Sequence, residues 1–481
     1  MKVSADIIAK PLHHVIALSI NQNKFPTAWK YSKVIPLHKK ENKLERRNYR
    51  PVAILSPLSK ILEKVVYLQI YDYFTRNHIF HPNLHGYRHN RSTQTALLQM
   101  YDRWVTAAAA GQVSGVVLLD LSAAFDLVEP SILIQKLRIY GVDENFLAWV
   151  QSYLTNRKQA VWIDHCFSDF LDSDVGVPQG SNLGPLFFLI FYNDLPYTLD
   201  CELEVFADDS SMNTTAKKVE DIGTKLTSEG ARVSQWMLEN RLKLNADKTH
   251  LLTVGTQERL RNLPAQPRVV MDGLVIEESS EKSELLLGCT IQSDLKWHSQ
   301  IENLLSKLKT RLAGLSKLKY LVPFGIRKTI TQSIFNSVMV YCLPLYGGCD
   351  KYQIKAIQVL QNKAALIVTH LPPRTSRTEL FERVNWLTVN QLIVYHTLIT
   401  IYKVRQNNEP EYLATKLKND TRTGRILIPN TDLRLAQNSF VIRGSASWNA
   451  LPESIRTQAK IRTFKKLTKK WISDNIPRFM D

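Results

Sequence analysis

Two adjacent carboxylates stand in the stretch VFADDSSM, residues 205–212. An apolar run leads directly to Asp208 and Asp209, and the chain then becomes polar. Two like charges side by side are unfavourable unless a positive charge lies near them. A third carboxylate, Asp120, follows another apolar run at residues 114–122. If both runs are neighbouring strands of one antiparallel sheet, the three carboxylates meet and can hold Mg²⁺, which prefers oxygen ligands.

Each of these features is common when taken alone, because an Asp-Asp turn is usually solvated and Asp120 could instead cap a helix. The combination is more specific. Three segments occur in a fixed order: LDLSAAFD at 119–126, GVPQGSNLGPLFF at 176–188 and FADD at 206–209. Two ions about 3.5–4 Å apart between such carboxylates can activate a hydroxyl nucleophile and stabilise a leaving pyrophosphate. The pattern therefore indicates nucleotidyl transfer.

These three segments resemble palm motifs A, B and C of reverse transcriptases, and their wording is similar to that of non-LTR (LINE-type, jockey-like) retrotransposons. YRPVAILSPLSKILEKVV and NLHGYRHNRSTQTALL resemble the finger motifs, WMLENRLKLNADKTHLL resembles motif D and LLGCTIQSDLKW resembles motif E. The resemblance is strong over residues 25–300 and continues weakly beyond them. It implies an RNA-directed DNA polymerase that joins dNTPs to a primer 3′-hydroxyl with Mg²⁺, or Mn²⁺ in its place.

The resemblance implies roles for the residues nearest the chemistry. Asp120, Asp208 and Asp209 match the catalytic, metal-binding carboxylates, with Asp209 closer to the primer end. Leu121 would lend a backbone carbonyl to one ion. Lys248, in NADKTH, matches the motif D lysine and would protonate the leaving pyrophosphate as a general acid. An ordinary surface lysine is the alternative interpretation of Lys248.

Further residues would hold the incoming nucleotide. Phe125 matches the position that packs against the sugar, where a ring excludes a 2′-hydroxyl and favours deoxynucleotides; the alternative is an ordinary core residue. Gln179 and Gly180 belong to a Gly-Pro-Gln-Gly segment whose backbone would approach the nucleotide and template base, or which forms a plain turn. Lys33 and Arg50 would bind the triphosphate as cations, or belong to a solvated basic face.

The elements that must position these residues follow from periodicity and turn signals. Helices are expected at 56–74, at 91–110 with Ser92 as N-cap, and at 219–241. A hairpin is expected within 158–180, and 242–254 should return as a strand. We expect an α+β right-hand polymerase. Its parts are fingers and palm with an antiparallel sheet at 1–292, a helical thumb at 293–370, and a basic C-terminal region of unclear fold at 371–481.

Charge is unevenly distributed over the 481 residues, whose formal net charge is +18. Residues 351–481 carry 22 Lys and Arg against 9 Asp and Glu, and residues 1–50 carry 11 against 3. Basic ends around a slightly acidic middle favour a polyanionic partner, although lysines can also serve solubility alone. The expected partners are an RNA template, a DNA primer, the RNA–DNA hybrid and dNTPs; protein partners cannot be named.

The five cysteines show neither a disulfide framework nor zinc-ligand spacing, which fits a reducing compartment. The N-terminus is too broken by charge, proline and histidine for a signal peptide, and no apolar stretch is long enough to span a membrane. We therefore expect an intracellular protein, in cytoplasm and nucleus, without a membrane partner.

Two departures from the family pattern stand out. After FADD the chain reads SSMNTT, where members more often have Thr and then apolar residues, so we expect a poorer second strand in this hairpin. The chain also begins close to the finger motifs. We therefore expect a truncated copy or partial gene model without the upstream endonuclease domain, and we find no RNase H-like carboxylate set.

Rival interpretations remain open. The main one is a catalytically inactive, truncated element-derived protein that still binds nucleic acid, based on the basic ends and the polar run after Asp209. A maturase-like splicing factor shares the palm, but the C-terminal region offers no motif for intron binding. A viral RNA-dependent RNA polymerase must admit the 2′-hydroxyl, which Phe125 disfavours.

Overall fold

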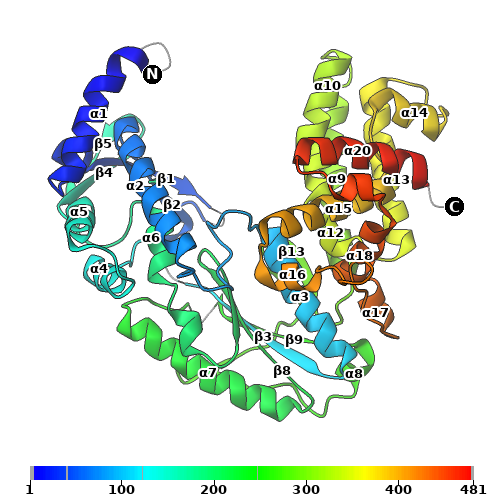
Figure 1. The fold of residues 1–481 in the computed structure, drawn as a ribbon, viewed down its shortest axis with the longest axis horizontal. Helices are drawn as coiled ribbons and strands as arrows, with labels where there is room; N and C mark the ends of the chain where they lie inside the picture. The colour runs from blue at the N-terminus through cyan, green and yellow to red at the C-terminus, as the bar shows by residue number, and fades with distance from the viewer. Residues whose placement is uncertain (1–4, 40–41, 122, 246–247, 478–481) are drawn as a thin grey trace.

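The computed structural model describes residues 5–39, 42–121, 123–245 and 248–477. Two arms rise from a shared sheet: a mixed arm of strands and helices from the N-terminal half, and a helical arm from the C-terminal half (Figure 1). The predicted α+β class with an antiparallel palm sheet is confirmed. None of the helices in these ranges has the length and apolar character needed to cross a membrane.

The palm sheet has four antiparallel strands in the order β7-β8-β3-β9. Strand β3 is buried along nearly its whole length, and its alternate side chains enter two different cores. Val117 packs with the N-terminal cluster, whereas Val116 packs with the cluster that extends into the helical arm. Helix α7 lies so close over β3 that a Cβ on Gly115 would stand 2.4 Å from Ile222. The strands are β3 (Val113–Leu119), β7 (Glu202–Phe206), β8 (Asp209–Ala216) and β9 (His250–Val254).

The expectation that SSMNTT would weaken the second hairpin strand is wrong. β8 is eight residues long and pairs with β7 on one side and with β3 on the other. Met212 is fully buried in the N-terminal core. The polar side chains have partners: Ser210 donates to Tyr192, Ser211 to the sulfur of Met100, and Asn213 to the carbonyl of Glu202. A polar sequence forms a central strand here because these buried groups are hydrogen bonded.

The N-terminal arm holds a second sheet in the order β2-β1-β4-β5, with β6 also paired to β4. Ser56 and Ser92 cap α2 and α3 through their side chains, so the Ser92 cap is confirmed. The hairpin expected within 158–180 is formed by β4, β5 and β6. The strands are β1 (Tyr31–His38), β2 (Tyr49–Ile54), β4 (Arg157–Ile163), β5 (Cys166–Phe167) and β6 (Leu171–Ser173).

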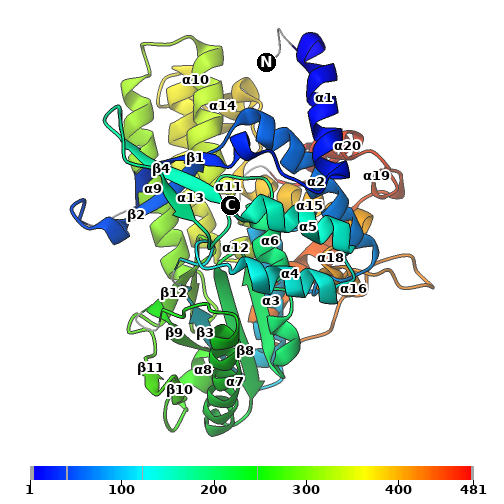
Figure 2. The ribbon, with the colours of Figure 1, turned by 90° about the vertical axis from the view of Figure 1, so that its left-hand side faces the viewer.

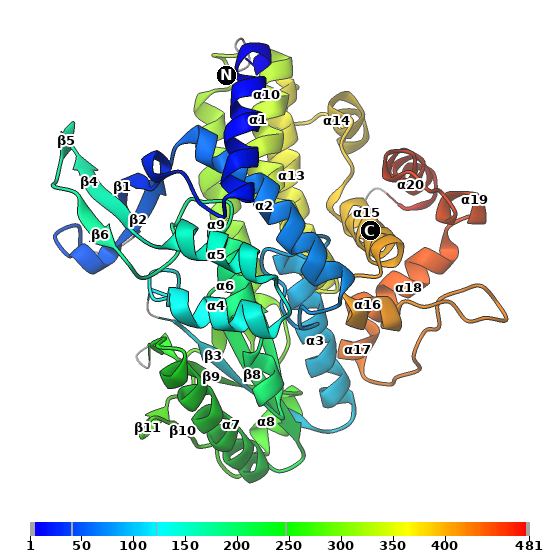
Figure 3. The ribbon, with the colours of Figure 1, turned by 60° about the vertical axis from the view of Figure 1, so that its left-hand side comes forward.

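The helices of the N-terminal half include α7, which lies along the outer face of the palm sheet (Figure 3). They are α1 (Ala5–Asn21), η1 (Thr27–Trp29), η2 (Arg46–Asn48), α2 (Pro57–Arg76), α3 (Thr93–Ala109), α4 (Pro130–Ile139), α5 (Glu144–Leu154), α6 (Gly184–Phe191), η3 (Leu195–Thr198), α7 (Val219–Glu239) and α8 (Gln257–Arg261).

The strand expected over 242–254 is shorter than predicted, because only His250–Val254 joins the sheet. Before it, Leu244 forms an isolated bridge with Leu121. Two small hairpins follow, and the turn of the second lies against the helical arm, where the Tyr341 hydroxyl donates to the carbonyl of Leu287 at 2.7 Å. The hairpins are β10 (Val269–Met271) with β11 (Leu274–Ile276), and β12 (Ser283–Leu286) with β13 (Cys289–Gln292).

The helical arm begins with α9, which stands side by side with α13 and close to α10 (Figure 2). Residues 371–477 continue as helices, and their apolar side chains share one core with α9 and α3. The helices are α9 (His298–Lys317), α10 (Phe324–Thr331), the π-helix η5 (Gln332–Asn336), α11 (Ser337–Val340), α12 (Leu343–Tyr346), α13 (Lys351–Thr369), α14 (Arg377–Val384), α15 (Val389–Asn407), α16 (Glu411–Lys416), α17 (Arg434–Gln437), α18 (Phe440–Ala450), α19 (Glu453–Arg456) and α20 (Ile461–Asn475).

Polar contacts also attach this arm to α3 and the segment before it. Arg88 and Arg91 both form ion pairs with Glu409. The Tyr412 hydroxyl donates to Asp102 at 2.8 Å. The C-terminal region is therefore built onto the palm side of the molecule by both apolar packing and ion pairs.

Candidate active site

The palm sheet brings the three predicted carboxylates together. Leu119 of β3 pairs with Ser210 of β8, which places Asp120, the next residue, beside the start of β8. Asp209 opens β8 and Asp208 lies in the tight turn from β7, after Ala207 in the left-handed region at φ 61°. The arrangement follows from antiparallel register, because the end of β3 and the beginning of β8 share one edge of the sheet.

The three carboxylates lie within electrostatic reach of one another. The pKa of Asp209 is raised above its ordinary value, first by burial and then by the charges of Asp208 and Asp120. Repulsion of this kind is relieved when a cation lies between the groups. Within the described part of the chain, no group of three His, Cys, Asp or Glu side chains converges tightly enough to form a metal centre as the side chains stand.

Asp120 is held by the segment that follows α7. Its carboxylate accepts a hydrogen bond from the Asn245 amide at 3.2 Å, and its backbone carbonyl accepts one from the Asn245 N–H at 2.8 Å. The Lys248 ammonium lies 3.5 Å from the same carboxylate, with the lysine side chain largely exposed. Lys248 therefore stands at the carboxylates, as expected from its motif. The neighbouring Leu121 is buried, and its proposed carbonyl contact stays a prediction.

Aromatic rings form one side of the site. Phe125 is half-buried and stacks on Phe188, with ring centroids 4.7 Å apart, while Tyr87 meets it edge-on at 6.3 Å. Burial and the charge of Asp208 raise the pKa of Tyr87, and Arg50 opposes that shift. Tyr87 thus lies within electrostatic reach of both Asp208 and Arg50.

The Gly-Pro-Gln-Gly loop is tied to the fingers and to the end of motif A. The Gln179 amide donates to the Asp126 carboxylate at 2.8 Å, and the Gln179 carbonyl accepts from the N–H of Ala53 in β2 at 2.7 Å. Gly180 has φ 129°, and a Cβ there would stand 2.3 Å from the carbonyl oxygen of Ala53. Only glycine fits this close approach of two backbones.

Two finger cations behave differently from each other. The Lys33 ammonium lies 3.3 Å from the centroid of the Trp162 ring, and Phe167 is near it at 5.4 Å. Its contacts are therefore with the β4–β5 hairpin and not with the carboxylates. Lys39, at the end of β1, is close enough to Asp126 to act against the burial that raises the pKa of that carboxyl.

Comparison with known proteins agrees with this geometry. Residues 37–313, more than half of the chain, match the family described as reverse transcriptase (RNA-dependent DNA polymerase). The chain belongs to the reverse transcriptase family. It is 26% identical over 444 residues to a probable RNA-directed DNA polymerase from transposon BS of Drosophila melanogaster, covering 86% of this chain and 47% of the relative. It is 26% identical over 407 residues to the RNA-directed DNA polymerase from mobile element jockey of the same species, covering 82% and 43%.

The chain thus spans less than half the length of these two relatives. Among solved structures, it is similar to apo telomerase from Candida tropicalis at 13% identity and a TM-score of 0.39, covering 56% of this chain and 55% of that one. The RNA-dependent RNA polymerase of a human picorbirnavirus matches at 10% identity and a TM-score of 0.41, covering 75% and 64%.

Several residues at this reverse transcriptase site were not predicted. Asn245 fixes Asp120 and lies three residues before Lys248 in the quoted NADKTH segment. Asp126 ends the LDLSAAFD segment, and its carboxylate accepts a hydrogen bond from the Gln179 amide. Tyr87 stands within the finger motif HGYRHN. Their motifs offered a signal, but their contacts depend on chain segments that the fold brings from far away.

A buried ionic cluster lies behind the same hairpin. Glu204 of β7 accepts from His85 at 2.7 Å and from Gln99 at 3.1 Å, and it forms an ion pair with Arg103. The segment around His85 pairs in parallel with β7, because the His85 N–H donates to the carbonyl of Val205 at 2.8 Å. These residues were not singled out from the sequence, and they support the strand that leads to Asp208.

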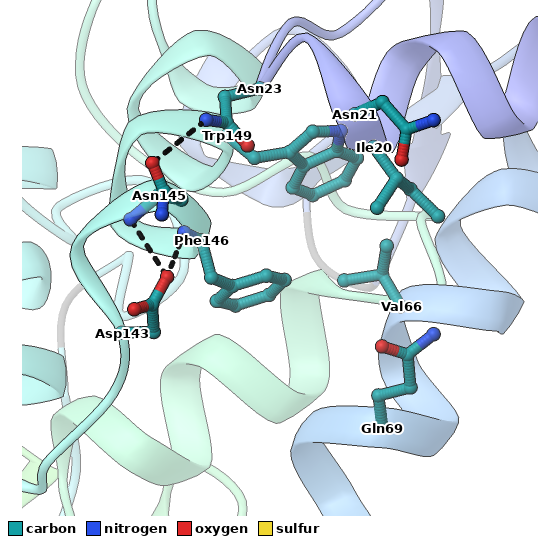
Figure 4. Close-up of a pocket in the computed structure, with 9 residues that line it drawn as sticks. All are labelled: Ile20, Asn21, Asn23, Val66, Gln69, Asp143, Asn145, Phe146 and Trp149. Carbon is teal, nitrogen blue, oxygen red and sulfur yellow. Dashed lines mark hydrogen bonds between the residues drawn. The ribbon is translucent and has the colours of Figure 1, made fainter.

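A pocket of about 410 Å³ lies elsewhere, between α1, α2 and α5 on the outer side of the fingers (Figure 4). Ile20, Val66, Phe146 and Trp149 form its apolar walls. The three carboxylates and the Gly-Pro-Gln-Gly loop are not among the residues that line it. It is therefore separate from the candidate active site.

Proposed function

We propose that the protein is an RNA-directed DNA polymerase of a non-LTR retrotransposon, which extends a primer 3′-hydroxyl with dNTPs on an RNA template. The observation that carries the proposal is the convergence of Asp120, Asp208 and Asp209 on one edge of the palm sheet. Membership of the reverse transcriptase family and the names of the jockey-type relatives support it.

The donor set fits divalent cations, because the three carboxylates repel one another and offer hard oxygen ligands. Bound at Asp120, Asp208 and Asp209, Mg²⁺ or Mn²⁺ would supply activation of the primer hydroxyl and stabilisation of the leaving pyrophosphate. Lys248 neutralises Asp120 in the free protein. In the polymerase reaction this ammonium would turn to the pyrophosphate and give it a proton.

The rest of the site would bind and orient the nucleotide. The Phe125 ring, held by Phe188, would close the space beside the sugar and exclude a 2′-hydroxyl. Gln179 and Gly180 would present amide and backbone groups to the template base and the nucleotide. Arg50 would bind the triphosphate, and Lys33 would join it from the fingers if its ammonium leaves the Trp162 ring.

The assignment of polymerase subdomains to ranges of the chain belongs to the same proposal. Residues 1–292 would act as fingers and palm, 293–370 as thumb, and 371–481 as a basic C-terminal region. The end of β13 at Gln292 and the start of α9 at His298 support the first boundary. The shared core of the last two regions supports a thumb and C-terminal region that move together. An RNA template and the RNA–DNA hybrid would be recognised mainly through their phosphates.

Primer extension on an RNA template with dNTPs and Mg²⁺ tests the proposal. Wild type should extend the primer, and Asp208→Ala should not, while both bind the primer–template equally. Asp221→Ala is the matched control, because this exposed carboxylate lies on the outer helix α7 and its loss should change neither property. Binding without extension by wild type would contradict the proposal and leave an inactive nucleic-acid-binding protein.

A further inference from the structure

A second cavity, of about 370 Å³, lies in the helical arm, far along the chain from the palm motifs. Its walls come from the π-helix η5, α11, α13, the turn between α14 and α15, α15 itself and α20. Six residues define its chemistry: Gln332, Asn336, Trp386, Tyr395, His396 and Lys469. Aromatic rings and amide groups therefore face one space, with a cation at its edge.

Two polar groups behind this wall have no partner within the protein. The indole N–H of Trp386 and the side-chain oxygen of Asn336 are both buried and make no hydrogen bond. A buried polar group without a partner is costly and calls for an explanation. Both atoms are closed off from solvent as the side chains stand, so a bound molecule would reach them only after those side chains turn.

The backbone is irregular at the same place. Residues 332–336 form a π-helix between α10 and α11, and the amide N–H of Ser337 bonds to the carbonyl of Gln332. Single π-helical turns inside α-helices are frequent at functional sites. Both ends of this turn, Gln332 and Asn336, line the cavity. The irregular turn thus supplies amide groups to the space between the helices.

Lysines surround the cavity. The Lys469 ammonium donates to the carbonyl and side-chain oxygens of Asn385, both at 3.3 Å. Burial and then Lys328 lower the pKa of Lys469. Burial, followed by Lys465 and Lys403, lowers the pKa of His396 to about 4, so its ring is neutral at pH 7. None of the described residues lining the cavity carries a carboxylate.

We propose that this cavity binds an unpaired base of a single-stranded nucleic acid, with the adjoining phosphates on the lysines of α20. Trp386 and Tyr395 offer rings for stacking, and base–aromatic stacking tolerates any sequence. The amide side chains that line the cavity would meet the polar edge of the base. A duplex keeps its bases paired and cannot place one here, which separates this site from a general basic surface.

The inference goes beyond the proposed polymerase activity, and its test is binding. A 15-nucleotide single-stranded RNA carrying 4-thiouridine is irradiated with the full chain, while excess unlabelled primer–template occupies the polymerase cleft. Cross-links should map to peptides containing Trp386 or Tyr395. Cross-links confined to other regions would overturn the proposal. An inactive polymerase site would leave this result unchanged, so the two proposals can fail separately.

A cavity-filling pair measures the contribution to affinity. Ser337 lines the cavity, whereas Ser333, one turn earlier on the same helical stretch, is exposed and does not. Ser337→Phe should weaken binding of single-stranded oligonucleotide at least about fivefold, the factor that corresponds to about 1 kcal/mol of stacking. Ser333→Phe should leave it unchanged. Equal affinities for the two variants would overturn the proposal.

A charge pair provides an independent measurement should Ser337→Phe fold poorly. Lys469→Glu and Lys470→Glu change the charge of α20 equally, but only Lys469 lines the cavity. Lys469→Glu should weaken binding of single-stranded RNA and DNA several-fold more than Lys470→Glu at the same salt concentration, and Lys469→Arg should restore it. If both glutamate variants weaken single-strand binding equally, or if Lys469→Glu weakens duplex binding as much as single-strand binding, the lysines act only as a general positive charge. Either result would contradict the proposed site.

Discussion

Two of the carboxylates in the β7–β8 hairpin, Glu204 and Asp209, have opposite surroundings. Glu204 is buried in β7, yet its pKa lies below the ordinary value: burial acts to raise it, and the His85 hydrogen bond and the Arg103 charge outweigh burial. Asp209, across the turn, has a solvent-accessible side chain that the surrounding protein still partly desolvates, and this desolvation and the charges of Asp208 and Asp120 raise its pKa. The buried acid is satisfied within the protein, and the exposed one is not.

The contrast distinguishes a structural carboxylate from one that awaits a ligand. A buried charge with internal partners stabilises the fold and offers nothing to a substrate. A group of mutually repelling carboxylates at a strand edge is unfavourable until a cation from outside joins it. Changing each group to its isosteric amide should therefore affect different properties, and the following predictions use that difference.

Asp120→Asn should give the largest effect. Loss of a carboxylate that would hold the cation should reduce primer extension by about 10³-fold, the rate equivalent of several kcal/mol. Fold stability should change little, because the amide still accepts from Asn245. Extension rates and thermal unfolding are measured together. Glu202→Gln, on the same hairpin but paired with Arg103, is the control and should keep its activity. A folded Asp120→Asn variant that extends the primer at the wild-type rate would show that this carboxylate does not take part in the chemistry, and the contrast with Glu204 would fail.

Glu204→Gln should have the opposite pattern: a large loss of stability and little loss of primer extension. The change leaves Arg103 and His85 beside a neutral group, and breaking a buried ion pair costs about 3–5 kcal/mol in the free energy of unfolding. Extension per folded molecule should be largely retained below the unfolding temperature. Denaturant unfolding and extension at 15 °C check the two parts. A stable variant that has lost extension would place Glu204 in the chemistry.

The loss in free energy of unfolding caused by Glu204→Gln should also depend on pH. Because the pKa of Glu204 is depressed in the folded protein, its stabilisation is present above the ordinary glutamate pKa. The stabilisation is lost as pH falls through the folded-state pKa. The gap in unfolding free energy between wild type and variant should therefore narrow below about pH 4.5. A constant gap from pH 7 to 4 would mean that the effect comes from packing.

The two regions also differ in how well the sequence predicts them. Asp120 and the Asp208-Asp209 pair each follow an apolar run, and the order of the three motifs resembles that of reverse transcriptases, so the sequence predicts that these carboxylates meet. The cluster around Glu204 needs His85 and Arg103, whose side chains approach only after α3 and the edge of β7 are packed. Local patterns carry no information about such distant pairings.

Polar composition misled the prediction for β8. Ser210, Ser211 and Asn213 read as a weak strand, but Tyr192, Met100 and Glu202 supply partners from other elements. The sequence could not predict the cavity in the helical arm for the same reason, since its walls come from segments between Gln332 and Lys469 that the fold brings together. The basic composition of 351–481 was visible, whereas its helical packing onto α3 was not.

Phe125→Val should affect selection at the site without affecting the buried cluster. Shortening the ring opens the space beside the sugar, so the preference for dNTP over rNTP should fall by about 10–100-fold, the range in which side-chain size in a pocket discriminates. Single-nucleotide insertion with each substrate measures it. Phe188→Leu, beneath the ring, is the control and should alter stability more than selectivity. Unchanged discrimination would assign Phe125 to the core.

Asp209→Asn should have the smallest effect, and it tests the repulsion directly. Without divalent metal, removing one of three like charges should raise the unfolding temperature by roughly 1–2 °C. The sign with pH follows from the raised pKa: the repulsion is present at neutral pH and is relieved as pH falls through the folded-state pKa of Asp209. The gain in unfolding temperature should therefore vanish towards pH 4.

Mg²⁺ should raise the unfolding temperature of wild type more than that of the variant, because the cation binds the folded carboxylates. A variant that is less stable than wild type without metal would show that Asp209 is satisfied by the protein, as Glu204 is, and the contrast across the hairpin would be lost.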